Sequence, residues 1–115
     1  QRSVKLVQIP NIPETTNSSI HCSVMTSFFL NHNDCSVMAW GGIPSHSVIS
    51  GGTIYHQPTR LDFFDSLNID RLFTSSVCSM CLALTRDYKL LAWGKNTMCV
   101  IGGDFPEVLF HCFVI

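Results

Sequence analysis

The sequence predicts an all-β fold built from two copies of one strand-rich repeat, and three observations support this prediction. Two segments each read as an apolar strand, a polar turn and a second apolar strand that ends in Ala-Trp-Gly, with Trp40 and Trp93 lying 53 residues apart. The apolar runs have the length of strands and are bounded by turn residues. A unit of about 50 residues with several short strands is typical of a β-propeller blade, which buries its faces only against neighbouring blades.

The first repeat is predicted over residues 1–52. Strands are expected at Phe28–Asn31 and Ser36–Gly41, because both are short apolar runs on either side of a polar turn. The chain must reverse between them, and Asn33 and Asp34 tolerate the positive φ that tight hairpins often need. This copy is the more degenerate of the two.

The second repeat is predicted over residues 53–103, with strands at Leu82–Thr85 and Lys89–Gly94. Its turn is one residue shorter, and Arg86-Asp87 is expected to reverse the chain. Residues 104–115 are predicted to begin a third repeat. With about two blades present, we expect the propeller to be completed by further chain or by a partner, since a ring takes roughly four to eight blades.

Glycines and prolines are expected to mark the ends of the strands. Gly41 and Gly94 follow the tryptophans, where the backbone must bend or the strand must end, and the pairs Gly51-Gly52 and Gly102-Gly103 end each repeat. The stretch 61–71 is expected to be a strand or a short turn. All five prolines are expected between strands, where a missing N–H costs little: Pro10, Pro13, Pro44, Pro58 and Pro106.

The second repeat resembles the repeat of the regulator of chromosome condensation family. The family pattern of Leu-Ala-Leu-Thr, Asp-Gly, Leu, Trp-Gly, Asn and a final Gly is matched by Leu82–Asn96 and by Gly102. The sequence departs from the pattern at the turn glycine, which is Tyr88, and at Cys99–Ile101, where the family has Gly-Gln-Leu. The first copy keeps Trp40-Gly41 but has Ile43 in place of the Asn.

The resemblance implies a seven-bladed propeller in the complete protein, of which this chain supplies about two repeats. It also implies a protein-interaction module that binds its partner through loop faces. Two alternatives stay open. One is a guanine-nucleotide exchange factor for a Ran-like small GTPase, and the other is a scaffold or substrate-recruiting segment of a larger ubiquitin ligase or assembly. No exchange-factor residue of the family matches a position in this sequence.

Composition excludes several classes of protein. Charged residues make up 13% of the chain, about half the usual share of roughly 25%. The formal net charge of -1 argues against direct nucleic-acid binding, which needs clustered Lys and Arg. The apolar content of 46% excludes a disordered tail, and no apolar run approaches the 18 residues or so of a membrane span.

The sequence nominates no catalytic, cofactor-binding or metal-ligating residue, so we expect a protein that is not an enzyme. Cys78 and Cys81 have the spacing of half a zinc site, and His111-Cys112 could complete it. However, residues three apart in a strand point to opposite faces, so the side chains of Cys78 and Cys81 would not converge on one metal ion without a turn between them. We expect reduced thiols and an intracellular location, because the sequence shows no signal-peptide pattern. Trp40 and Trp93 are expected to pack each blade against its neighbour.

Overall fold

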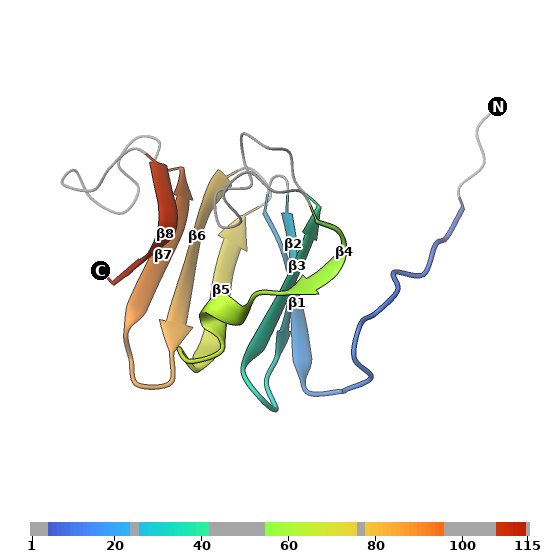
Figure 1. Ribbon diagram of the computed structural model, residues 1–115, viewed down its shortest axis with the longest axis horizontal. Helices are drawn as coiled ribbons and strands as arrows, with labels where there is room; N and C mark the ends of the chain where they lie inside the picture. The colour runs from blue at the N-terminus through green and yellow to red at the C-terminus, as the bar shows by residue number, and fades with distance from the viewer. Residues whose placement is uncertain (1–4, 24–25, 42–54, 76–77, 96–107, 115) are drawn as a thin grey trace.

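Two four-stranded antiparallel sheets make up the computed structural model, which describes residues 5–23, 26–41, 55–75, 78–95 and 108–114 (Figure 1). The prediction of an all-β fold is confirmed. In each sheet the strands lie side by side in sequence order. Sheet A contains β1 (Ser18–Cys22), β2 (Thr26–Asn31), β3 (Ser36–Gly41) and β4 (Tyr55–Arg60). Sheet B contains β5 (Ile69–Ser75), β6 (Cys78–Thr85), β7 (Leu90–Lys95) and β8 (Val108–Val114).

The two predicted hairpins are confirmed as β2–β3 and β6–β7, and their pairing agrees position by position. Since the two turns differ by one residue in length, each residue of β2 corresponds to the residue 54 positions later, and each residue of β3 to the one 53 positions later. Equivalent residues then sit opposite equivalent partners. The matching pairs are Phe28–Ala39 and Leu30–Val37 in sheet A, and Leu82–Ala92 and Leu84–Leu90 in sheet B.

In both hairpin turns, the residue with positive φ lies one position later than the sequence predicts. Positive φ falls on Cys35 (61°) and Tyr88 (67°), not on Asn33, Asp34 or Asp87. The aspartates act through their side chains instead, because Asp34 Oδ1 accepts a hydrogen bond from the Ser36 backbone N–H at 2.9 Å. A short hairpin loop closed by a left-handed residue matches the right-handed twist of the strands.

The other expected strand ends are met in part. Gly41 and Gly94 both have positive φ, as expected for a bend after each tryptophan. The expectation for Pro58 is wrong, because it lies inside β4; β4 is an edge strand, where the missing N–H removes no ladder bond. The stretch 61–71 forms the short 3-10 helix η2 (Asp62–Phe64) and the start of β5. The glycine pairs and Pro44 and Pro106 lie outside the described residues.

The boundaries of the sequence repeats do not coincide with the boundaries of the two sheets. Strand β4 belongs by sequence to the repeat at 53–103, yet it pairs with β3 and completes sheet A. In the same way β8, from residues 104–115, pairs with β7 and completes sheet B. The fourth strand of each sheet therefore belongs by sequence to the next repeat, and its pairing links consecutive repeats.

The hydrophobic core lies between the two sheets. Trp93 is its largest fully buried side chain, at 1% exposure, and its ring contacts Phe28 of sheet A edge-on, with centroids 6.0 Å apart. The ring centroid of Phe64, in η2, lies 5.2 Å from that of Trp93. Trp93 therefore packs one sheet against the other, as predicted. Strand β1 also contacts β5, so the first strands of the two sheets are neighbours. Among the described residues, no helix is long and apolar enough to cross a membrane.

The two sheets stack with equivalent faces pointing in the same direction. The face of sheet A that meets sheet B, inner face A, carries Phe28, Leu30, Val37 and Ala39. The residues of sheet B at the equivalent positions do not face sheet A. Because side chains alternate along a strand, they lie on the opposite face of sheet B, outer face B, which consists of Leu82, Leu84, Leu90 and Ala92, with Phe73 beside Leu82. Inner face B carries Leu72, Ala83, Leu91 and Trp93, and their equivalents form outer face A: Ile20, Phe29, Met38 and Trp40.

Candidate functional site: the turn edge

One end of the molecule gathers the hairpin turns of both repeats. This turn edge comprises residues 32–35 and 86–89, the connection 62–68 through η2, and the stretch 15–17 that leads into β1 (lower end in Figure 1). These segments are far apart in the sequence but meet because both hairpins point the same way. The turn edge is where polar and charged side chains of the two sheets come together.

One hydrogen bond at the turn edge joins the two sheets directly. The Arg86 guanidinium, through Nη2, donates to the backbone carbonyl of His32 at 2.9 Å. The first turn is held on its other side by Asn33, whose Nδ2 donates to Thr15 Oγ1 at 2.9 Å and whose Oδ1 accepts from Asn17 at 3.0 Å. The relative position of the two turns is therefore set by side-chain contacts as well as by the core.

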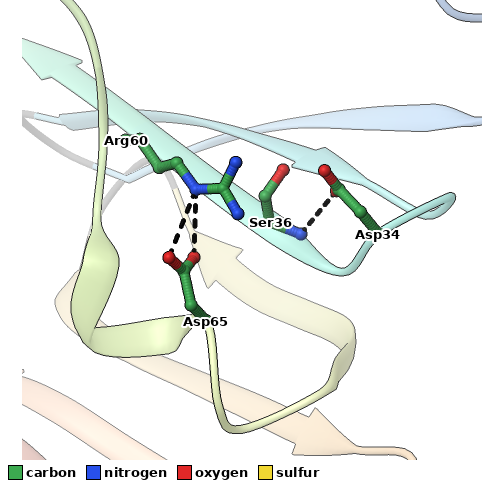
Figure 2. A network of polar contacts seen from close by, with 4 residues as sticks. All are labelled: Asp34, Ser36, Arg60 and Asp65. Atoms are coloured by element: carbon green, nitrogen blue, oxygen red, sulfur yellow. Dashed lines mark hydrogen bonds and ion pairs between the residues drawn. The ribbon is translucent and has the colours of Figure 1, made fainter.

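Charges at the turn edge are of both signs, and part of them form ion pairs. Figure 2 shows the Arg60 Nε donating to both carboxylate oxygens of Asp65, at 3.1 and 3.3 Å. The same view shows Asp34 accepting the hydrogen bond from Ser36. Hydrogen bonds from Ser36, with a further contribution from the positive charge of Arg60, hold the pKa of Asp34 below its usual value. This surface has no excess of positive charge to attract phosphate groups.

The second turn repeats this arrangement with different partners. The Thr85 hydroxyl donates to Asp87 Oδ1 and accepts a hydrogen bond from the Lys89 backbone N–H at 2.9 Å. The hydrogen bond from Thr85, with the nearby charge of Lys89, lowers the pKa of Asp87. Beside this turn lies a cavity of about 150 Å³, which is lined by Ser66, Leu67, Asn68, Thr85, Asp87, Lys89 and Leu91.

Tyr88 is the most prominent apolar group of the turn edge. Its side chain is 87% exposed, and its backbone has a φ of 67°. The left-handed region costs a non-glycine residue roughly 1–2 kcal/mol. An aromatic side chain held in solvent on a strained turn contributes nothing to the core, which makes Tyr88 available to a binding partner.

A second polar cluster lies on β1 and was not found by sequence reasoning. Ser19 Oγ lies 2.8 Å from His21 Nε2 and 3.1 Å from His32 Nε2. Burial, helped by the neighbouring His32, lowers the pKa of His21. The only sequence signal is that Ser19 and His21 lie two apart in a strand and thus share a face; the approach of His32 depends on the fold.

The cluster does not form a recognisable catalytic or metal site. A serine nucleophile needs a base that a third group orients, but here two imidazoles share one hydroxyl. A structural zinc site takes four ligands, and within the described residues no three His, Cys, Asp or Glu side chains converge. Cys78 and Cys81 lie in one strand, β6, and His111-Cys112 in β8. Cys22 and Cys35 carry free thiols.

Comparison with known proteins points to the fold and to nothing more specific. No protein-family model matches the sequence, and no curated protein matches it. Among solved structures, human WBSCR16, an RCC1-like protein, is similar over 84% of this chain, with a TM-score of 0.63 and 22% sequence identity. This chain spans about a quarter (24%) of the WBSCR16 chain. At that identity the likeness shows a shared fold alone: the antiparallel all-β arrangement of part of an RCC1-like protein.

Proposed function

We propose that the chain is a protein-interaction module that forms about two blades of a seven-bladed propeller of the regulator of chromosome condensation (RCC1) type. The stacking of the two sheets carries this proposal. Equivalent faces point in the same direction, so each sheet meets the next as a blade meets its neighbour in a ring. The contact between β1 and β5, each the first strand of its sheet, fits strands that lie next to a common axis. The likeness to WBSCR16 supports the same arrangement.

A protein partner fits the turn edge better than a nucleic acid or a small substrate does. The apolar faces of the sheets are used for stacking, and the turn edge is a polar surface among the residues that the structure describes. Its charges are of both signs and include the ion pairs Arg60–Asp65 and Lys89–Asp87, and Tyr88 adds an exposed aromatic side chain of the kind that dominates protein interfaces. We propose a binding role inside the cell, without catalytic activity of its own.

The test compares which proteins are retained by three immobilised forms of the chain. The double variant Tyr88→Ala/Arg86→Ala removes the exposed ring and the inter-sheet hydrogen bond of the turn edge. The control, His56→Ala, changes an exposed residue near the other end of β4 from Arg60. A partner that wild type and His56→Ala retain and the double variant loses supports the proposal. Equal retention by all three forms contradicts it.

A release assay with labelled GDP separates the binding module from the exchange-factor alternative. Exchange on a Ran-like small GTPase would appear as faster GDP release when the protein is added. We expect no acceleration, because no described residue of the turn edge matches an exchange-factor residue of the family. Faster release that the turn-edge double variant abolishes would favour the exchange factor instead.

A further inference from the structure

The two outer faces of this chain are complementary to each other, in the same way as the two inner faces that already meet. Inner face A is the partner of inner face B within the molecule. Outer face B presents the equivalents of inner face A, and outer face A presents the equivalents of inner face B. A second copy of the chain can therefore continue the stack by repeating a contact that the structure already contains.

The exposure of equivalent residues shows which groups lack a neighbour. Leu72 is 4% exposed on inner face B, whereas its equivalent Ile20 is 58% exposed on outer face A. Trp93 is 1% exposed, and its equivalent Trp40 is only partly buried. On outer face B, Phe73 is 45% exposed. Ile20 and Trp40 are thus more open than Leu72 and Trp93, whereas Phe29 of outer face A (3% exposed) and Ala92 of outer face B (0% exposed) are already buried in the single chain.

We propose that the chain associates head to tail with further copies of itself, outer face B of one copy binding outer face A of the next. In this arrangement Trp40 of one copy lies over Leu82 of its neighbour, as Trp93 lies against Phe28 within the chain. Such a contact joins two different surfaces, so it leaves one free face at each end and continues beyond a dimer unless the ring closes. The inference rests on the proposed stacking of repeats.

The proposal is tested by sedimentation velocity, which measures the association state over a concentration series. Two aspartate variants of the whole chain are used, each at an exposed apolar residue of one outer face. Ile20→Asp places a charge on outer face A, and Phe73→Asp places one on outer face B. Wild type is expected to associate beyond a dimer as concentration rises. Each variant alone is expected to stay monomeric, with association weakened about tenfold or more, because a hot-spot residue contributes over 1 kcal/mol.

The mixture of the two variants gives the decisive result. Ile20→Asp keeps an intact outer face B, and Phe73→Asp keeps an intact outer face A. Head-to-tail binding therefore predicts that the equimolar mixture forms a one-to-one heterodimer and nothing larger. Tyr88→Asp, at the turn edge, is the matched control and is expected to associate as wild type does. Circular dichroism checks folding, and Ile20→Thr and Phe73→Thr replace any aspartate variant that unfolds.

Three results would overturn the proposal. The first is a wild-type chain that stays monomeric at all concentrations. The second is a mixture that forms no heterodimer, and the third is a single variant that dimerises as strongly as wild type, since that would indicate a face that binds itself. None of these results contradicts the proposed function, because partner binding is tested separately. A chain that stays monomeric, and whose partner is no longer retained by the turn-edge double variant, would disprove self-association and still support the interaction module.

Discussion

Trp93 and Trp40 hold the same position in their repeats but have different surroundings. Trp93 is closed in by Phe28 and Phe64, whereas Trp40 is partly open on outer face A. We predict that Trp93→Ala lowers the free energy of unfolding by about 3–5 kcal/mol, as large-to-small changes in a core do. Trp40→Ala should cost clearly less. Urea denaturation at low protein concentration measures both, and equal losses would contradict the assignment of the two faces.

Tyr88 is predicted to limit stability through its backbone. Its side chain is exposed, so its removal loses little packing, while its φ of 67° suits glycine. Tyr88→Gly should therefore raise the free energy of unfolding by about 1 kcal/mol, as the left-handed penalty is relieved. Lys89→Gly is the control and should destabilise, since it adds backbone freedom without relieving positive φ. A destabilised Tyr88→Gly in thermal melts would show that the ring makes contacts that stabilise the fold.

The His21 imidazole is predicted to make stability depend on pH in the weakly acidic range. Its pKa is lowered from 6.5 in the folded chain, chiefly by burial. Below about pH 6.5 the unfolded chain then takes up a proton that the folded chain resists, so the free energy of unfolding falls as pH falls. His21→Asn should flatten this slope between pH 7 and pH 5. Asp34 acts in a lower range, because a lowered carboxylate pKa loses its stabilisation only as pH falls below about 4.

Residue-level features could be predicted only where they are local in sequence. The bends at Gly41 and Gly94 follow from a glycine directly after each tryptophan, at or near the end of the strand. The cluster of Ser19, His21 and His32 could not be predicted, because it needs the pairing of β1 with β2 to bring the turn back to the first strand. The same holds for the strained position of Tyr88, which the turn length and strand twist select together.

Elements formed from nearby residues were predicted well, and those formed by distant pairing were not. Both hairpins carry their strand signal and their turn within about 15 residues, so local pattern suffices. Strand β4 has a weak pattern, with Pro58 in it, and reaches sheet A from beyond residues 42–54. The offset between repeat and sheet depends on this long-range pairing, which hydrophobic alternation alone does not specify.

Arg86 is predicted to couple the two hairpins as elements. Its guanidinium donates to the His32 carbonyl across the sheets. We expect Arg86→Met to lower the free energy of unfolding by about 0.5–1 kcal/mol, a modest value because the contact is exposed. Arg71→Met, at an exposed position of β5, serves as the control. An unchanged stability for Arg86→Met in urea denaturation would show that the core alone fixes the two turns.

At the scale of the whole molecule, the low charge content follows from the stacking. A sheet that meets a neighbour on one face only can carry polar side chains on the other. Here outer face B is apolar as well, with Leu82, Leu84 and Leu90 partly buried, and outer face A carries Ile20 and Trp40. Within the described residues, most charged residues therefore lie in loops, turns or at strand ends, with Asp70 and Arg71 inside β5 as exceptions, in keeping with a charged fraction of 13%.

The most direct test of the same-direction stacking is acrylamide quenching of each tryptophan in turn, at a concentration too low for association. Trp40→Phe leaves Trp93 as the fluorophore, and Trp93→Phe leaves Trp40. The account predicts that Trp93 is shielded and emits at shorter wavelength, while Trp40 is quenched readily and emits at longer wavelength. Equal quenching of the two, or a Trp40 that is better shielded than Trp93, would contradict it.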